Sequence, residues 1–305
     1  MPHVTDTARP FGSVLTAMVT PMTTDGAVDL EATVRLARHL VDAGNDGLVL
    51  SGTTGEASTT HAPEKAEIVQ AVVEAVGDRA YVLSGAGSND TAHAVRMAEQ
   101  AAEAGAHGLL VVAPYYSRPS QPGVLRHFEA VADATDLPVM LYDVPGRTGV
   151  RLAPATIEQI AAHPRVVAMK DAAGDPYASS KAITRTGLAW YSGDDSLLLP
   201  LLAVGAVGIV SVVGHVAAGQ LAAVTRAWRD GDPAEALRVS RTIIPAIDAL
   251  NGAGFQAVAA KAALEITGHL PTRAVRLPLV AASDDELETI RAGLRAAGLL
   301  DIALR

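Results

Sequence analysis

The chain has 305 residues and a formal net charge of −9. The length fits one large domain or two small ones and is ample for a sizeable core. An acidic chain without a basic run argues against a nucleic-acid partner. Cysteine is absent, which excludes disulfides, thiolate metal sites and catalysis by cysteine.

Two stretches of the sequence bear on the cellular compartment of the protein. Residues 196–225 carry no charged side chain and are long enough to span a bilayer. However, Pro200 and several glycines interrupt them, so we interpret the stretch as a buried helix, a buried strand and the start of another helix. Residues 1–10 lack the apolar segment of a secretory signal peptide. We therefore expect a soluble, cytoplasmic protein with no membrane partner.

The predicted elements alternate along the chain. Short apolar runs bounded by turn residues are typical of strands buried on both faces, and Ala-rich amphipathic segments are typical of helices. We predict strands at Val14–Val19, Gly47–Leu50, Tyr81–Ser84, Gly108–Ala113, Val139–Tyr142, Val166–Lys170, Trp190–Ser192 and Val207–Val212. We predict helices between them at Leu30–Ala43, Pro63–Val76, Thr91–Ala104, Gln121–Ala134, Pro154–Ala162, Tyr177–Arg185, Ser196–Val204 and Ala217–Arg229.

Eight consecutive strand–helix units predict an α/β fold, a closed (β/α)8 TIM barrel over residues 1–230 that carries the active site. An open doubly wound sheet shows the same alternation, but no Gly-x-Gly-x-x-Gly follows an early strand. Three more helices without intervening strands are predicted at Pro233–Asn251, Phe255–Thr267 and Asp284–Ala297. We expect residues 231–305 to form a C-terminal helical extension within the same folding unit.

The sixth predicted strand ends in a lysine. In Val166–Asp171, four apolar residues lead directly into Lys170. An ammonium group above an apolar floor has a lowered pKa, as a lysine that attacks a carbonyl near neutral pH requires. The chain has only three other lysines, all in predicted helices. Taken alone, the pattern fits a solvent-exposed lysine better. The residues at the neighbouring strand ends must therefore decide between a reactive and a solvent-exposed lysine.

Hydroxyl groups and glycines follow the second strand. In Ser51–Glu56, two glycines enclose Thr53 and Thr54, so backbone N–H groups and threonine side chains are available to bind a small carboxylate. An ordinary turn has the same composition.

Half of the six tyrosines, Tyr115, Tyr116 and Tyr142, follow the fourth and fifth strands. A phenol can donate or accept the protons that a Schiff-base mechanism moves. Core packing is the alternative, and it fits Tyr115 better than the other two.

The remaining strand ends offer charged groups. Arg147, on a Pro- and Gly-bounded loop, can bind a second carboxylate, although a solvated surface arginine is the alternative. Asp194 and Asp195 fit helix N-caps better than an acid–base couple. The nine histidines show no metal-binding spacing, so we expect no metal.

These motifs together resemble the dihydrodipicolinate synthase family, of the class I aldolase-like superfamily that includes N-acetylneuraminate lyase. The resemblance extends from Phe11 to the C-terminal helices and rests on Gly52–Glu56, Pro114–Tyr116, Tyr142–Gly149, Met169–Asp171 and Ser192–Asp195. It implies a lyase that condenses pyruvate with L-aspartate 4-semialdehyde in diaminopimelate and lysine biosynthesis, without cofactor or metal.

The resemblance also implies a role for individual residues. Lys170 forms the pyruvate imine and Tyr142 transfers protons to and from the adduct. Thr53 links Tyr142 to Tyr116, which the neighbouring subunit supplies in an expected homotetramer (a dimer of dimers). The implied substrate-binding residues are Thr54 for the pyruvate carboxylate, Arg147 for the semialdehyde carboxylate, and the backbone carbonyls of Gly193 and Ile209.

The chain departs from the family at the subunit-interface site where lysine inhibits many bacterial members. Asn89 and Tyr115 are kept, but the other matching positions carry Ala57, Ala62, Lys65 and His93. Two basic residues disfavour an ammonium ligand, which predicts weak or absent inhibition by lysine.

Two alternatives remain. A sister pyruvate-dependent lyase, acting on N-acetylneuraminate or a 2-keto-3-deoxy sugar acid, would keep Lys170 and Tyr142. Sialic acid lyases, however, tend to carry Ser-Thr at Thr53–Thr54, and both sister groups lack the motif that places Arg147. A non-catalytic barrel that binds keto acids would not need the lysine and the hydroxyl groups together.

Overall fold

The computed structural model describes residues 8–252 and 254–300. Its strands are β1 (Val14–Ala17), β2 (Gly47–Leu50), β3 (Tyr81–Gly85), β4 (Gly108–Val112), β5 (Val139–Asp143), β6 (Val166–Asp171), β7 (Ala189–Ser192) and β8 (Gly208–Ser211). They form one closed barrel in sequence order, with every neighbouring pair parallel. The predicted barrel is confirmed.

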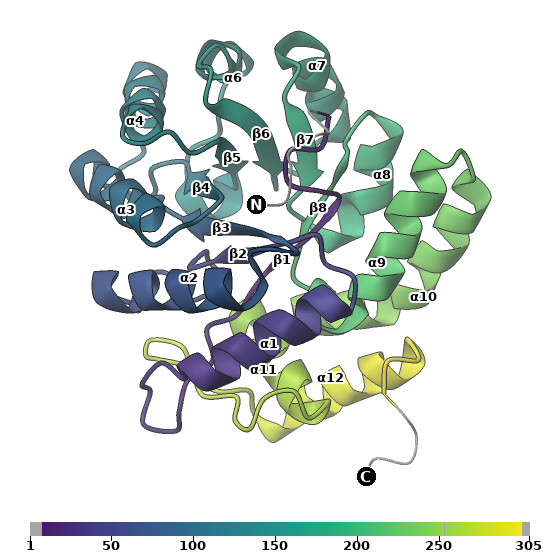
Figure 1. The fold of residues 1–305 in the computed structure, drawn as a ribbon. Helices are drawn as coiled ribbons and strands as arrows, with labels where there is room; N and C mark the ends of the chain where they lie inside the picture. Colours follow the sequence, from purple (N-terminus) through teal and green to yellow (C-terminus); the bar gives the residue numbers. More distant parts are fainter. Residues whose placement is uncertain (1–7, 253, 301–305) are drawn as a thin grey trace.

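The helices surround this barrel in Figure 1. They are α1 (Leu30–Asp42), α2 (Ala62–Val76), α3 (Thr91–Glu103), α4 (Gln121–Asp133), α5 (Pro145–Thr148), α6 (Pro154–Ala161), α7 (Pro176–Thr186), the 3-10 turn η1 (Asp195–Leu197), α8 (Leu198–Ala203), α9 (Gly214–Arg229), α10 (Pro233–Gly252), α11 (Gln256–Ile266) and α12 (Asp284–Ala296). The predicted ends differ from these by at most three residues. The short helix α5 was not predicted, because four residues show no helical period.

Local signals explain where the helices begin. Asp29, Asp90 and Asp175 accept hydrogen bonds from backbone N–H groups in the first turns of α1, α3 and α7. Proline occupies the first turn of α2, α4, α6 and α7, where its missing N–H costs no helical hydrogen bond.

The core has an inner and an outer layer. Inward-facing side chains, among them Leu15, Val49, Leu83 and Met140, fill the barrel, while a second layer packs the outside of the strands against the helices. Each fully buried aliphatic side chain contributes roughly 1.5–3 kcal/mol. A filled barrel leaves its chemistry to the C-terminal strand ends.

The C-terminal helices pack on one side of the barrel. Helix α10 lies against α9, and α11 and α12 pack on α10 and on each other. Their apolar cluster includes Val14 and Ile209 from the barrel strands. The extension therefore shares its core with the barrel wall.

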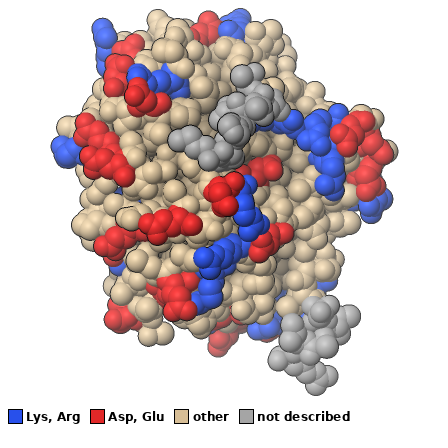
Figure 2. Space-filling model, viewed as in Figure 1, with Lys and Arg blue, Asp and Glu red and all other residues tan. Residues whose placement is uncertain are grey.

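The charged surface and the uncharged segment can be located in the structure. On the face in Figure 2, acidic and basic side chains are interspersed, with no extended basic patch. Residues 196–225 form α8, β8 and most of α9, the predicted helix, strand and helix. Within the described residues, none of the helices has the length and apolar character needed to cross a membrane.

Candidate active site

Lys170 lies near the C-terminal end of β6, where its neighbours in the ladder are Tyr142 of β5 and Tyr191 of β7. Only 5% of its surface is exposed, and its Nζ lies 4.3 Å from the centre of the Tyr142 ring. Burial, assisted by the positive charge of Arg147, lowers the pKa of Lys170 to about 7, against the opposing effect of Asp195. A substantial fraction of the amine is therefore neutral, and nucleophilic, near pH 7.

Tyr142 is buried beside this amine, with 5% of its surface exposed. Burial raises the pKa of its phenol, while Arg147 and a side-chain hydrogen bond with Thr53 act in the opposite sense. The phenol therefore stays protonated near neutral pH and is able to donate a proton next to Lys170.

Thr53 belongs to a tightly constrained segment between β2 and α2, residues 51–57, which we call the threonine loop. Its backbone takes positive φ angles at Ser51 (52°) and Glu56 (57°). A Cβ atom on Gly55 would lie 3.0 Å from the backbone N of Ser51, so only glycine fits there without a shift. Thr54 is buried, with 5% exposed. The loop has a defined shape, as expected of a carboxylate-binding turn.

Arg147 lies on α5, which Gly149 ends with a φ of 75°. Its Nη2 donates to Oε1 of Gln256 at 2.5 Å, and its guanidinium lies 5.0 Å from the centre of the Phe255 ring. The side chain is exposed at the cavity mouth. The arginine is thus held at the entrance while its charge remains available to an anion.

A cavity of about 800 Å³ opens at this end of the barrel. Its walls include Thr53, Tyr142 and Arg147, with Tyr115 and Tyr116 also among the lining residues. Lys170 is not among them, but its Nζ lies 4.3 Å from the centre of the ring of Tyr142, which does line the cavity. The structure therefore places Thr53, Tyr142 and Arg147 around one space, with the lysine next to one of its walls.

The three tyrosines differ from prediction in one respect. Tyr116 is 88% exposed and Tyr115 is 38% exposed, whereas Tyr142 is buried. The prediction that core packing fits Tyr115 best is wrong, because Tyr142 points inward from β5 while Tyr115 lies in the loop after β4. Tyr116 has a φ of 70°.

The two predicted carbonyl positions lie directly after β7 and inside β8. Gly193 follows β7, and its N–H donates to the Asp171 carbonyl at 2.7 Å. Ile209 lies in β8 opposite Ser192, with its side chain in the outer apolar cluster. Their roles as pocket carbonyls stay predictions.

The paired acids behave differently from each other. Asp194 accepts from the Ser196 N–H at 2.9 Å, as an N-cap does. Asp195 is not a cap: it is buried and accepts from the Ser211 hydroxyl and from the N–H groups of Val212 and Val213. The N-cap prediction is therefore wrong for Asp195, which ties η1 to the end of β8. Across residues 8–252 and 254–300, no cluster of three or more His, Asp or Glu side chains is arranged to hold a metal ion.

Sequence reasoning missed the contribution of α11. Phe255 and Gln256 contact Arg147, and Lys261 forms a fully buried ion pair with Glu56 of the threonine loop. One signal was present: Lys261 interrupts an otherwise apolar run, Ala257–Leu264, and a lysine in such a run requires a buried acidic partner.

Comparisons with known proteins agree on one family. Residues 10–297 match the Dihydrodipicolinate synthetase family. The chain is 53% identical over 293 residues to 4-hydroxy-tetrahydrodipicolinate synthase 2 of Streptomyces coelicolor, covering 95% of this chain and 96% of the relative. It is also 53% identical to the synthase of Kineococcus radiotolerans, with 95% and 94% covered.

Solved structures give the same result. The fold matches a dihydrodipicolinate synthase of Cyanidioschyzon merolae, solved with lysine bound, with a TM-score of 0.92 and 38% identity over 95% of this chain and 99% of the other. The dihydrodipicolinate synthase of Bacillus anthracis matches with a TM-score of 0.90 and 38% identity, over 93% and 98%. Together with the full-length match to the family, these similarities show that the chain belongs to the dihydrodipicolinate synthetase family.

Proposed function

We propose that this chain condenses pyruvate with L-aspartate 4-semialdehyde to give 4-hydroxy-tetrahydrodipicolinate, in the branch that leads to diaminopimelate and lysine. The observation that carries the mechanism is the buried Lys170, whose pKa is lowered to about 7, in contact with Tyr142. The family membership and the relatives' names support the substrates.

The reaction begins with attack of the neutral Lys170 amine on the keto carbon of pyruvate. Tyr142 donates a proton to the departing hydroxyl, so the carbinolamine loses water and becomes an imine. Loss of a proton from the pyruvate methyl group gives an enamine, which forms the carbon–carbon bond to the aldehyde. The amine of the semialdehyde then attacks the imine carbon, closes the ring and releases Lys170. Because the protonated imine is itself the electron sink, no cofactor or metal takes part.

The positions of the binding residues support the following proposed roles. The threonine loop offers the backbone of Thr54 to the pyruvate carboxylate, and Thr53 connects to Tyr142. Arg147 lines the mouth of the cavity. Its proposed role there is to bind the carboxylate of the second substrate. Backbone carbonyls of Gly193 and Ile209 complete the pocket.

One experiment tests the function against its alternatives. The protein is incubated with pyruvate and borohydride, the modified lysine is located by mass spectrometry, and turnover is measured with L-aspartate 4-semialdehyde. We expect an adduct on Lys170 and condensation. No adduct contradicts the enzyme mechanism, and an adduct without condensation favours a sister lyase.

The rate of imine formation should follow the protonation of Lys170. Only the neutral amine attacks, so with a pKa of about 7 the trapping rate should rise with pH through 7 and fall nearly tenfold per unit well below it. Borohydride trapping over a series of pH values measures this. A midpoint near the ordinary lysine pKa of about 10.4 would contradict the lowered value.

Removing Arg147 should separate the two substrates. For Arg147→Ala we expect the KM for the semialdehyde to rise by ~10- to 100-fold, the loss of a charge-assisted hydrogen-bonded pair. The KM for pyruvate should change little. The pH midpoint for trapping should move upward, because Arg147 contributes to the lowered pKa of Lys170. Steady-state kinetics with each substrate varied checks this, and equal rises in both KM values would contradict it.

Free lysine should inhibit this enzyme weakly or not at all. Lys65 is 9% exposed, and its ammonium donates to the Ala57 carbonyl at 2.9 Å without an ion pair to any described residue. Lys65, His61 and His93 all line the cavity of about 800 Å³ described above. The ammonium groups of a lysine ligand would lie close to these basic side chains, which disfavours its binding. Inhibition by submillimolar lysine in a steady-state assay would rule this out, and the double variant Lys65→His with His93→Glu should gain sensitivity.

We also propose that the active unit is at least a dimer within a homotetramer, with Tyr116 of one subunit completing the relay of another. Its 88% exposure in the single chain leaves the side chain free to reach across an interface. Mixing the inactive variants Lys170→Ala and Tyr116→Phe should then restore activity, since one mixed site has both groups intact. A fully active monomer in sedimentation would contradict the proposal. We further propose that the enzyme works in the cytoplasm.

A further inference from the structure

We propose that Lys261 and Glu56 are positioning residues through which helix α11, outside the barrel, holds the threonine loop in its catalytic shape. The inference rests on the proposed function, because the loop matters only if Thr53 and Thr54 serve the reaction.

The contact is a buried ion pair between segments far apart in sequence. Nζ of Lys261 donates to Oε1 of Glu56 at 2.5 Å and to the Ala274 carbonyl at 2.6 Å. Both charged side chains have 0% of their surface exposed. Water therefore does not compete for either group, so a displacement of one side chain leaves the other without a partner.

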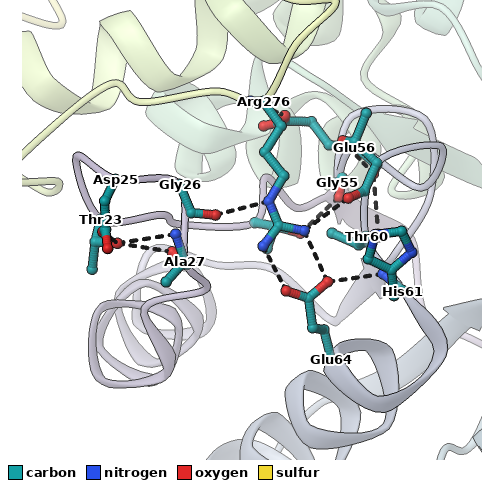
Figure 3. Close-up of polar contacts among 12 residues, drawn as sticks. Thr23, Asp25, Gly26, Ala27, Gly55, Glu56, Thr60, His61, Glu64 and Arg276 are labelled. Carbon is teal, nitrogen blue, oxygen red and sulfur yellow. Dashed lines mark hydrogen bonds and ion pairs between the residues drawn. The ribbon is translucent and has the colours of Figure 1, made fainter.

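The second carboxylate oxygen of Glu56 is fixed from the same side. It accepts from the backbone N of Arg276 at 3.0 Å. The Arg276 guanidinium in turn donates to the Gly26 carbonyl and to both oxygens of Glu64, as Figure 3 shows. It also donates to the Thr59 carbonyl. The segment after α11 thus contacts the threonine loop at the Glu56 carboxylate. It also contacts Thr59 and Glu64, which follow the loop.

The backbone of Glu56 transmits this restraint to the threonines. Its N–H donates to the Thr53 carbonyl at 3.2 Å, and the next N–H, of Ala57, donates to the Gly52 carbonyl at 3.1 Å. Glu56 takes a left-handed φ of 57°, a conformation that a non-glycine residue keeps only when its surroundings impose it. Because Thr53 and Tyr142 line the same cavity, release of Glu56 would displace the threonine relative to the phenol.

Stability alone does not explain the pair. Lys261 lies in an alanine-rich helix where neighbouring residues are fully buried, a setting in which an apolar side chain serves packing at least as well. Taking two charges out of water generally offsets their mutual attraction, so a buried pair contributes geometry more than net stability.

The decisive variant is therefore the double change Lys261→Met with Glu56→Gln, which removes both charges and leaves no lone buried ion. We expect a melting temperature near that of the parent, a KM for pyruvate raised ~10-fold and a kcat lowered ~10-fold, since small displacements of catalytic groups reduce rates strongly. The KM for the semialdehyde should change less, because Arg147 lies on α5 and its partner Gln256 lies at the start of α11, outside the Lys261–Glu56 contact. Lys261→Met alone should melt lower, since Glu56 is then buried without its partner.

The matched control is Glu265→Gln, on the same helix as Lys261. It breaks the ion pair of Glu265 with Arg273, which follows the helix, and leaves the threonine loop untouched. It should leave both KM values and kcat as in the parent. Parent-like kinetics for the double variant would overturn the inference, as would the same kinetic defect in Glu265→Gln. If the parent itself forms no pyruvate adduct, the proposed function fails and this inference fails with it. An adduct-forming parent with a parent-like double variant overturns the inference alone.

Discussion

Lys170→Ala should form no pyruvate adduct and lose turnover by on the order of 10⁴-fold or more, because covalent catalysis has no second nucleophile at this site. Among the other three lysines, Lys65 and Lys261 are occupied in hydrogen bonds on α2 and α11, and Lys181 lies on α7. The fold should be retained, because Lys170 lies near the C-terminal end of β6 and alanine removes a buried amine that itself costs stability. Trapping followed by mass spectrometry and circular dichroism measure the two effects.

Lys170 should lower the free energy of unfolding of the parent protein. Its pKa is about 7 in the folded chain and about 10.4 when unfolded. Between these values the unfolded chain binds more protons, so the free energy of unfolding rises with pH through this window. Below pH 7 the full penalty applies, on the order of 5 kcal/mol.

A variant of similar volume isolates this penalty from the cavity that alanine leaves. Lys170→Met should therefore be more stable than the parent below pH 7, and the difference should shrink toward pH 10. Urea titrations at pH 6 and pH 9 measure it. Equal stability of the two proteins at both pH values would contradict a buried, low-pKa lysine.

Tyr142→Phe should reduce kcat by roughly 10²- to 10⁴-fold, the usual contribution of a positioned proton donor. The phenylalanine ring keeps the packing over Lys170, so the adduct still forms, but slowly. Stopped-flow measurement of imine formation and of turnover separates these steps. Thr53→Val should have a smaller effect in the same direction, because it removes only the hydrogen bond to the phenol.

Tyr191 provides the matched control. It is also inward-facing and pairs with Lys170 across β6 and β7. Its hydroxyl, however, donates to the Gly12 carbonyl at 2.9 Å, away from the lysine amine. Tyr191→Phe should lower the melting temperature slightly and leave kcat unchanged. Equal losses of kcat in the two tyrosine variants would show that Tyr142 acts through packing rather than through its proton.

Predicted elements succeeded where the signal is local. Gly47–Leu50 was predicted with both ends correct, because apolar residues and turn residues mark it on both sides. Errors fall where three-dimensional contacts decide the ends. Helix α9 opens with a short turn at Gly214, whose N–H donates to the Ser211 hydroxyl, and its backbone leaves helical geometry at Ala217 (φ −133°, ψ 28°), where the predicted helix starts. The helical pattern therefore finds the long segment but not the turn before it, which that contact places.

The sequence by itself determined the eight strand–helix units, the lysine that ends the sixth strand, and the hydroxyl groups and arginine at other strand ends. Only the tertiary structure decided that Tyr142 is the buried tyrosine, that Gln256 holds Arg147, and that Lys261 reaches Glu56. The reason is physical: periodicity and turn chemistry depend on neighbours along the chain, whereas burial and ion pairing depend on which distant segments meet. Lys170 shows both, since its place at a strand end can be read from the sequence, but its desolvation arises from the walls of the closed barrel.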